Sequence, residues 1–261
     1  MSLDQPTAFV KHQTVTRDAF LGGSLTVSQP RHGFRAGLDS VLLGAATDAG
    51  RKTLLDLGCG VGTAALVALS HQQSLTAVLA DQNTEMLALA QTNIAENAMA
   101  ERANTLAVDV SAKGAVRLAA GLADNAFATV IANPPFFADG AGTLADDAGR
   151  AGARHMDAEA LDLWVKTAAG CAAGGGEIIF IYPAESLTPL LNAFDRRFGA
   201  LTVLPLTPRP GAAASRVLVR GIKGSRAPLT LLASRALHDD SGRGFQPAFD
   251  AIFRGTARLD W

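Results

Sequence analysis

The chain has 261 residues, of which 48% are hydrophobic and 18% are charged, and its formal net charge is −1. This composition is typical of a globular protein with a large hydrophobic core, and it excludes disorder over most of the length. The sequence has no apolar run of roughly 18 residues, which a membrane helix needs, and its first residues do not resemble a signal peptide. We therefore expect a soluble, cytoplasmic protein.

The predicted elements begin with a hairpin or extended segment over 20–30 and a helix over 37–46. From residue 53 onward, apolar runs of strand length alternate with stretches of helical period. The predicted strands are 53–58, 75–81, 104–109, 127–133, 176–183, 201–206 and 216–223. The predicted helices between the first six strands are 62–71, 84–98, 111–120, 157–173 and 185–198. Such alternation predicts an α/β fold, in which helices cover both faces of a parallel sheet and ligands bind at the carboxyl ends of the strands.

The end of the chain departs from this alternation. Only "TPRPGAAAS" separates the last two predicted strands, which is too short for a crossover helix, so they should pair antiparallel at one edge of the sheet. We divide the chain into residues 1–50, an N-terminal extension packed on the core, and residues 51–261, the main domain. The low-complexity stretch 138–153 is predicted to be either disordered or a loop over a binding site.

Two cysteines, Cys59 and Cys171, stand in no pattern that suits a metal or a disulfide framework. We expect two reduced thiols and no metal site.

The first candidate site is the segment "DLGCGVG", which follows the first strand of the predicted sheet. It contains Asp56, Gly58, Gly60 and Gly62. Glycines at alternate positions let the backbone approach a ligand closely, and the helix behind them offers free N–H groups. The dinucleotide fingerprint GxGxxG would need glycine where Thr63 stands, which disfavours a nicotinamide cofactor.

Two further carboxylates end the next two strands. Asp81 follows the glycines by about 20 residues, where an acidic side chain can accept hydrogen bonds from both ribose hydroxyls of a nucleoside. Asp109 is the last residue of the third predicted strand, where it could contact the adenine amino group of the same bound nucleoside. Either residue alone is more commonly a helix N-cap. Together with the glycine segment they predict an adenosine site.

The fourth strand ends in the elbow "IANPPFF". Asn133 is followed by Pro134 and Pro135, which donate no backbone hydrogen bonds and hold φ nearly fixed, and then by Phe136. The four features at the ends of the first four strands resemble the class I S-adenosylmethionine-dependent methyltransferases, in the branch that methylates exocyclic or amide nitrogens. The resemblance implies a Rossmann-like seven-stranded methyltransferase sheet with an antiparallel edge strand, and S-adenosylmethionine as the cofactor.

In that branch the elbow receives the target amino group. The resemblance implies that the Asn133 side-chain oxygen and the Pro134 carbonyl accept its two N–H bonds, while Phe136 stacks on the planar group. The prolines keep these acceptors in place. This chemistry needs no metal and no strong base.

Further segments narrow the resemblance. "RHGFRAGLDSVLLGAA" (31–46), "NPPFFADG" and "ARHMDAEALDLWV" (153–165) are similar to the bacterial tRNA adenine-N6 methyltransferases that modify a valine tRNA, over roughly residues 10–225. The expected reaction is therefore methylation of adenine N6 in tRNA.

Three alternatives stay open at this point. Ribosomal guanine-N2 methyltransferases share the elbow but usually have His where this chain has Phe137. Glutamine-N5 methyltransferases of release factors usually have Tyr in place of Phe136, and they carry an N-terminal helical domain for which about 50 residues is too short. A non-catalytic S-adenosylmethionine- or RNA-binding module is disfavoured by the intact elbow.

Charge and the upstream segment suggest further contacts with the ligands. Arg35 and Asp39 either line the cofactor pocket or order the target base, or Asp39 simply caps its helix. Residues 205–261 carry 9 Lys or Arg against 4 Asp or Glu. If the two ends of the chain come together near the elbow, their basic residues would form an RNA-binding surface, and strand alternation lets only some of them share it; they are Arg216, Arg220, Lys223 and Arg226 with Lys11, Arg17, Arg31 and His32.

Overall fold

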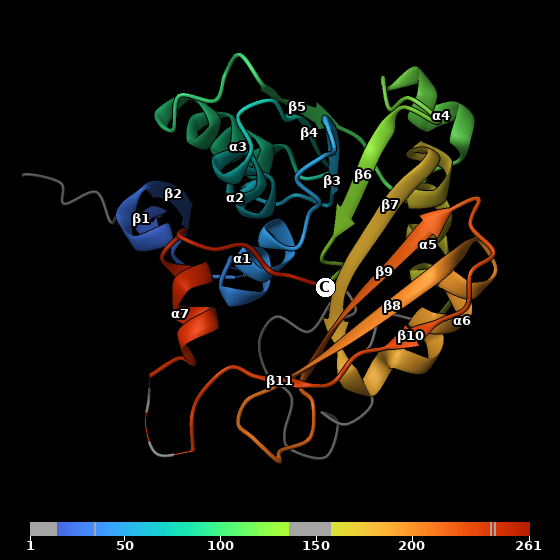
Figure 1. Ribbon diagram of the computed structural model, residues 1–261. Coiled ribbons are helices and arrows are strands. Elements are labelled where there is room, and N and C mark those ends of the chain that lie inside the picture. The colour runs from blue at the N-terminus through green and yellow to red at the C-terminus, as the bar shows by residue number, and fades with distance from the viewer. Residues whose placement is uncertain (1–14, 34, 136–157, 241, 243) are drawn as a thin grey trace, which may run out of the picture.

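The computed structural model describes residues 15–33, 35–135, 158–240, 242 and 244–261 (Figure 1). Phe136, Phe137 and the predicted loop 138–153 lie outside the described residues. No helix in the described part is long and apolar enough to cross a membrane.

The centre of the fold is a sheet of nine strands, with the order β10-β8-β9-β7-β6-β3-β4-β5 and β11 paired with β8. The seven predicted strands are all present, as β3 (Thr53–Leu57), β4 (Thr76–Asp81), β5 (Ala103–Ala107), β6 (Phe127–Ala132), β7 (Ala172–Pro183), β8 (Phe198–Thr207) and β9 (Arg216–Lys223). The first five pair parallel, as the alternation predicts. The α/β class with a parallel sheet is therefore confirmed.

The last two predicted strands, β8 and β9, pair antiparallel at one side of the sheet, as predicted. β9 pairs antiparallel with both β7 and β8, so it lies inside the sheet and not at its edge. The chain turns after β8, and β9 then runs between β7 and β8. Two short strands, β10 (Thr230–Leu231) and β11 (Arg235–Ala236), then cover the outer edge of β8. Each has two residues, too few to show a strand period in the sequence.

Helices cover both faces of the sheet. On one side lie α1 (Leu38–Ala45), α2 (Thr63–His71) and α3 (Thr84–Glu96), and on the other α4 (Gly114–Ala119), α5 (Ala158–Cys171) and α6 (Leu187–Asp195), which follows the short 3-10 helix η2 (Ala184–Ser186) (Figure 1). Helix α7 (Pro247–Phe253), which the sequence reading missed, packs near α1.

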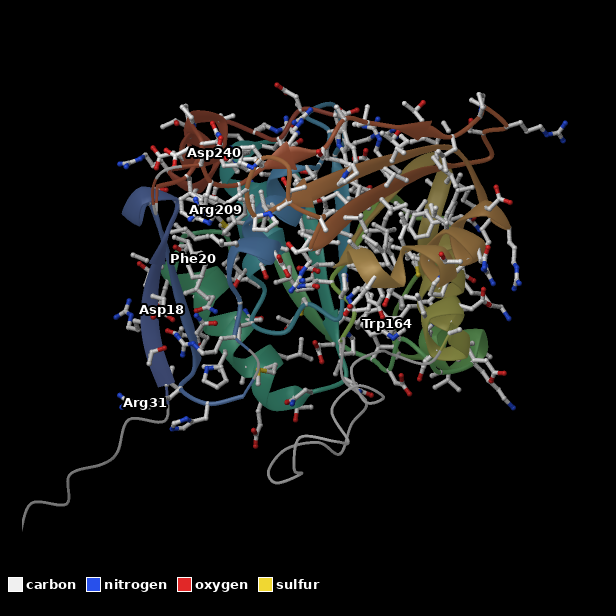
Figure 2. All side chains as sticks on the ribbon, turned by 90° about the horizontal axis from the view of Figure 1, so that it is seen from below. Asp18, Phe20, Arg31, Trp164, Arg209 and Asp240 are labelled. Carbon is white, nitrogen blue, oxygen red and sulfur yellow. The ribbon has the colours of Figure 1, made fainter. Side chains whose placement is uncertain are left out.

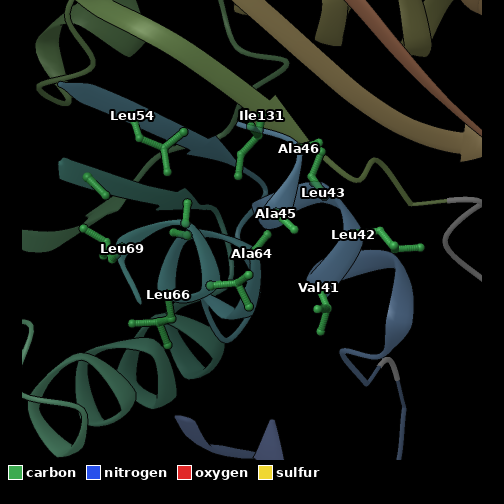
Figure 3. Close-up of a cluster of buried hydrophobic side chains, with 14 of the residues drawn as sticks. Val41, Leu42, Leu43, Ala45, Ala46, Leu54, Ala64, Leu66, Leu69 and Ile131 are labelled. Atoms are coloured by element: carbon green, nitrogen blue, oxygen red, sulfur yellow. The ribbon is translucent and has the colours of Figure 1, made fainter. Parts of the chain in front are cut away.

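Alternate residues of each strand serve two separate cores. Leu54 of β3 packs with α1 and α2 in one core (Figure 3), whereas its neighbour Leu55 belongs to the core beneath α5 and α6. Successive side chains of a strand point to opposite faces, so a strand buried on both faces must be apolar throughout. This explains the continuous apolar runs of the sequence.

The chain order of the strands creates a switch point beside β3. From β3 the chain proceeds to β4 and β5 on one side, and then crosses to β6 and β7 on the other. The loops after β3 and β6 therefore diverge at the carboxyl ends of the strands, where open α/β sheets bind ligands.

The N-terminal hairpin is longer than predicted. It comprises β1 (Val15–Phe20), the 3-10 helix η1 (Leu21–Gly23) and β2 (Leu25–Pro30), whereas the prediction began at residue 20. The sequence reading missed β1 because this strand of a two-stranded hairpin lacks an apolar run. The predicted division of the chain at residue 50 stays a prediction.

Asn93 joins the hairpin to the core. It is fully buried on α3, accepts from Ser28 N at 2.7 Å, and donates to the carbonyls of Ser28 at 3.0 Å and Val61 at 2.9 Å. One side chain therefore holds the hairpin, α3 and the loop after β3 together.

Replacing Asn93 by alanine should lower the free energy of unfolding by at least about 2 kcal/mol, because three buried backbone groups lose their partner. Chemical denaturation measures this difference. Gln91→Ala, at an exposed position of the same helix, is the matched control and should change stability by less than about 0.5 kcal/mol. Equal stabilities of the two variants would contradict the joining role of Asn93.

Candidate active site

The loop between β3 and α2 is shaped by its three alternate glycines. Gly58, Gly60 and Gly62 have φ of +67°, +54° and +85°, in the left-handed region that favours glycine. A Cβ on Gly62 would lie 2.5 Å from the Leu79 side chain, whereas one on Gly60 would meet nothing within 4 Å. Gly60 therefore presents bare backbone to open space.

Asp81, the last residue of β4, fixes this loop. Its Oδ2 accepts from Gly60 N and its Oδ1 from Asn83 N, both at 2.8 Å. Each carboxylate oxygen has a second lone pair that can accept from a ligand.

The loop and Asp81 form one wall of a pocket of about 280 Å³. We call it the glycine-loop pocket. Its lining residues are Ala36, Gly58, Gly60, Val61, Asp81, Gln82, Asn83, Met86, Val110, Asn133, Pro135 and Trp164. Backbone and a carboxylate on one side, with apolar and aromatic side chains elsewhere, suit a ligand that is partly polar and partly planar and apolar.

Trp164 of α5 is one of the lining residues that sequence reasoning missed. A Cβ on Gly58 would lie 2.3 Å from its ring, so the absence of a side chain at Gly58 makes room for the indole. Figure 2 shows Trp164 well apart from the hairpin residues Asp18 and Phe20. In the sequence Trp164 looks like one more apolar residue of an amphipathic helix, and only the fold places it at the pocket.

Asp56 lies behind the pocket and not in its lining. It is 3% exposed, and its Oδ2 accepts from Ala65 N in the first turn of α2 at 3.2 Å. Burial, helped by the charge of Asp81, raises the pKa of the Asp56 carboxyl to about 7, and the hydrogen bond from Ala65 opposes this shift. Asp56 thus connects β3 to the first turn of α2 behind the glycine loop.

The raised pKa of Asp56 makes stability depend on pH. The folded protein holds this proton up to a pKa of about 7, whereas the ordinary value of 3.8 applies when the chain is unfolded. The stabilising effect of the proton is complete below about pH 4 and is lost as the pH rises to about 7. The free energy of unfolding of the wild type should therefore fall over this range, by a few kcal/mol at most, relative to Asp56→Asn. Denaturation of both proteins at about pH 5 and about pH 8 measures the change, and a constant difference would contradict it.

Asp109 lies beyond the end of β5, which stops two residues earlier than the predicted strand. Its side chain is exposed, and Oδ1 accepts from both the N–H and the hydroxyl of Ser111, at 2.8 and 2.7 Å. The neighbouring Val110 lines the glycine-loop pocket instead. Asp109 therefore forms hydrogen bonds within its own turn and does not line the glycine-loop pocket.

Asn133 follows the last residue of β6, beside the switch point. Its side-chain Oδ1 is buried and has no hydrogen-bond partner among the described residues. Pro134 behind it is buried, and Pro135 is exposed at the pocket. A buried acceptor without a partner is costly and therefore uncommon, so this oxygen is a natural place for an N–H donor of a ligand.

A second pocket, also of about 280 Å³, lies on another side of Asn133. We call it the Arg216 pocket. It is lined by Arg35, Gly37, Leu38, Asp39, Ser40, Asn133 and Arg216. Asp39 therefore lies here and not among the residues that line the glycine-loop pocket, because its Oδ2 accepts from Arg216 Nε at 2.8 Å.

Neither cysteine has the properties of a nucleophile. Both are free, and burial raises the pKa of the Cys59 thiol well above its ordinary value and that of Cys171 to about 11. Among the described residues, no three His, Cys, Asp or Glu side chains form a group that would hold a metal ion.

The family comparison agrees with this geometry. Residues 38–203, from the start of α1 into β8, match the model of the methyltransferase small domain family. The chain belongs to this family.

Curated relatives of this methyltransferase carry a more specific name. The tRNA1(Val) (adenine(37)-N6)-methyltransferase of Shewanella halifaxensis is 31% identical over 176 residues, which are 66% of this chain and 68% of the relative. The protein of that name from Shewanella loihica is 31% identical over 193 residues, which are 72% of this chain and 76% of the relative.

Solved structures support the fold of the methyltransferase. A crystal structure described as a predicted O-methyltransferase from Agrobacterium tumefaciens has a TM-score of 0.73 and 29% identity, covering 85% of this chain and 98% of that one. The tRNA (m1A58) methyltransferase TrmI from Aquifex aeolicus has a TM-score of 0.51 and 15% identity, covering 76% of this chain and 72% of that one, which shows a shared fold alone.

The chain is thus an S-adenosylmethionine-dependent N-methyltransferase with the Rossmann-like fold. Its described residues suit this cofactor. The glycine-loop pocket combines a carboxylate at the end of β4, bare backbone at Gly60 and the apolar Val110 and Trp164. Asn133, whose buried Oδ1 has no hydrogen-bond partner among the described residues, lines both this pocket and the Arg216 pocket.

The basic residues of the methyltransferase do not all lie on one surface, as the alternation of side chains along a strand implies. Arg216 begins β9 and Lys223 ends it, so they lie at opposite ends of the sheet, and Lys223 Nζ donates to Asn125, Ala169 and Ala172.

Arg220 lies over the Trp261 ring, 4.5 Å from its centroid. Arg17 pairs with Glu96 at 3.0 Å, and Lys11 lies outside the described residues. Strand direction separates residues that the sequence places close together.

Proposed function

We propose that this enzyme methylates the N6 amino group of adenine in tRNA. The observation that carries the proposal is the buried Oδ1 of Asn133, which has no hydrogen-bond partner among the described residues and belongs to a residue that lines both the glycine-loop pocket and the Arg216 pocket. An amino group has N–H donors to offer to such an acceptor, whereas a deprotonated oxygen nucleophile has none. The orphaned acceptor therefore favours a nitrogen substrate.

The proposed roles at the elbow follow from hydrogen-bonding chemistry. Asn133 Oδ1 and the Pro134 carbonyl accept the two N–H bonds of the amine, which leaves its lone pair directed toward the glycine-loop pocket. S-adenosylmethionine supplies an electrophilic methyl group there. The two prolines restrict the backbone, so the acceptors are held in place before the substrate binds. Phe136, which lies outside the described residues, is proposed to stack on the base.

The proposed cofactor contacts come from the loops after β3, β4 and β5. Asp81 would accept from the ribose hydroxyls, and the backbone at Gly58 and Gly60 would allow close approach. Gly62 is the N-cap of α2, and its lack of a side chain leaves room for Leu79 behind the loop. Asp56 and Asp109 would act indirectly, through Ala65 and Ser111, which are the groups they bond.

The choice of adenine in tRNA rests on the relatives. The two Shewanella proteins are named for adenine-N6 methylation of a valine tRNA, and they share 31% of their aligned residues with this chain. The described elbow, Asn133 to Pro135, suits any planar amine, so guanine N2 and a glutamine side chain remain outcomes of the test.

The test is labelled methyl transfer from S-adenosylmethionine to unmodified total tRNA, to rRNA and to a release-factor protein in parallel. The proposal expects label in tRNA and its recovery as N6-methyladenosine after digestion. Label only in rRNA as N2-methylguanosine, or only in the protein, would contradict the substrate and leave the elbow chemistry standing.

A further inference from the structure

Four consecutive residues, 35–38, border three pockets at once. Ala36 lines the glycine-loop pocket, whereas Arg35, Gly37 and Leu38 line the Arg216 pocket. Gly37 and Leu38 also border a third pocket of about 500 Å³, part of which the hairpin lines. We call residues 35–38 the pocket wall. Its position helps to set the shape of both pockets at the proposed site.

The pocket wall has little backbone structure of its own. Residues 35–37, all within the described part of the chain, precede α1 and lie outside the strands. Gly37 is the N-cap of α1 and has no side chain with which to cap it. A segment without the regular hydrogen bonds of a helix or sheet depends on other partners for its position. Here those partners come from the N-terminal hairpin.

Gln29 on β2 bonds the pocket wall directly. It is 2% exposed, and its Oε1 accepts from Ala36 N at 2.8 Å. Its Nε2 donates to Asp18 Oδ2 on β1 at 2.5 Å. Because the amide oxygen must face an N–H and the amide nitrogen must face a carboxylate, these two partners fix the orientation of the side chain. Gln29 therefore joins the backbone of the wall to the other strand of the hairpin.

Asp18 is the centre of this network (Figure 2). Besides the bond from Gln29, its Oδ2 accepts from Thr16 Oγ1 at 3.1 Å and from Arg35 Nη2 at 2.6 Å. The bond from Gln29, together with Thr16 and Arg35, holds the pKa of the Asp18 carboxyl below its ordinary value, although burial opposes this shift. The carboxylate is therefore charged at neutral pH, and hydrogen bonds to a charged group are the stronger ones.

Arg35 makes a second connection between the wall and the hairpin. Its Nη1 donates to Thr16 Oγ1 at 2.9 Å and to the Pro30 carbonyl at 2.6 Å, in addition to the bond from Nη2 to Asp18. Thr16 and Asp18 belong to β1, and Pro30 is the last residue of β2. Two of the four wall residues, Arg35 and Ala36, are thus bonded to the hairpin.

We propose that Gln29 and Asp18 are positioning residues for cofactor binding: Gln29 holds Ala36 at the glycine-loop pocket, and Asp18 holds Gln29. This role rests on the proposed function, because it takes the glycine-loop pocket as the cofactor site. All three residues precede the segment that matches the methyltransferase family, 38–203. A wall that can shift makes the pocket less complementary to its ligand, so the affinity falls.

Calorimetric titration with S-adenosylhomocysteine tests these roles without any methyl transfer. Gln29→Leu keeps most of the side-chain volume and removes both bonds, so the dissociation constant should rise roughly 3- to 10-fold, about the value of one hydrogen bond. Asp18→Ala should raise it by a smaller factor, because Gln29 keeps its bond to Ala36. The double variant should resemble Gln29→Leu, since Asp18 acts through Gln29.

Arg17→Ala is the matched control on the same strand. Arg17 precedes Asp18, its side chain is 63% exposed, and it pairs with Glu96 of α3 at 3.0 Å, so it attaches the hairpin to α3 and not to the pocket wall. Its loss should leave the affinity unchanged. A comparable loss of affinity in Arg17→Ala would show that any loosening of the hairpin is enough, and would overturn the specific role of Gln29.

Steady-state kinetics separate positioning from a loss of folded enzyme. With unmodified total tRNA as substrate, Gln29→Leu should raise KM for S-adenosylmethionine and keep kcat within about twofold of wild type, because the lost interaction acts on binding. A purely structural defect would reduce the amount of active enzyme, and would lower kcat with KM unchanged. That result would overturn the positioning role.

Thermal unfolding of the variants without ligand shows which of them are folded. Unchanged affinity for S-adenosylhomocysteine in folded Gln29→Leu would overturn the inference and leave the proposed function standing. Should Gln29→Leu fail to fold, Asp18→Ala decides, and normal affinity in that variant would overturn the inference. Wild type that binds S-adenosylhomocysteine but methylates no adenine would overturn the proposed function, and the calorimetry of the variants would still decide the roles of Gln29 and Asp18.

Discussion

Replacing Asn133 by alanine is expected to slow methyl transfer by roughly 10²- to 10³-fold, the loss that follows removal of one hydrogen-bonding group aimed at the reacting atoms. The affinity for S-adenosylmethionine should stay within about threefold of wild type, because the proposed role of Asn133 is to bind the amine. Single-turnover kinetics measure the first quantity and calorimetry the second.

The reason for so large an effect lies in the burial of Oδ1. This oxygen has no partner among the described residues, so its hydrogen-bonding capacity suits an N–H donor of the substrate. Asn133→Asp is the matched control, because it keeps an oxygen at nearly the same position and should retain more activity than Asn133→Ala. Loss of cofactor binding in Asn133→Ala, or equal activities of the two variants, would contradict the role of the oxygen.

Replacing Asp81 by alanine is expected to weaken S-adenosylmethionine binding roughly 10- to 100-fold. Hydrogen bonds to a charged group contribute about 1.5–3 kcal/mol, and this carboxylate would lose its bonds to the ribose. It also accepts from Gly60 N and Asn83 N, so its loss should loosen the glycine loop that forms the same wall of the pocket. Calorimetric titration with S-adenosylhomocysteine, which does not react, measures the affinity directly.

Asp81→Asn provides the graded comparison. It keeps one carbonyl oxygen and places an amide donor at the other position, so its affinity should fall between those of wild type and Asp81→Ala. Thermal unfolding of the variants without ligand checks that the fold is retained. Normal affinity in Asp81→Ala would remove this carboxylate from the cofactor site.

Features that depend on short segments were predictable from the sequence. The alternation of apolar runs with helical stretches follows from burial of the sheet on both faces, and it predicted the strands β3 to β9. The alternate glycines predicted a loop of close approach, and Gly58, Gly60 and Gly62 do adopt left-handed φ.

Features that depend on side-chain direction or on distant partners were not predictable. Asp56 lies near the end of β3 and Asp109 two residues beyond the end of β5, and their carboxylates bond Ala65 and Ser111. The sequence cannot tell such a local bond from a ligand contact, because both use the same residue type. The pair of Asp39 with Arg216 depends on β9 lying between β7 and β8, whereas the sequence indicates only that the last two strands pair antiparallel at one edge.

The most direct test of the central claim is analysis of the product nucleoside. An unmodified transcript of a valine tRNA would be incubated with labelled S-adenosylmethionine and either wild type or Asn133→Ala, digested, and its nucleosides separated. The account predicts labelled N6-methyladenosine with wild type and almost none with Asn133→Ala. Label in another nucleoside, or equal labelling by both proteins, would contradict it.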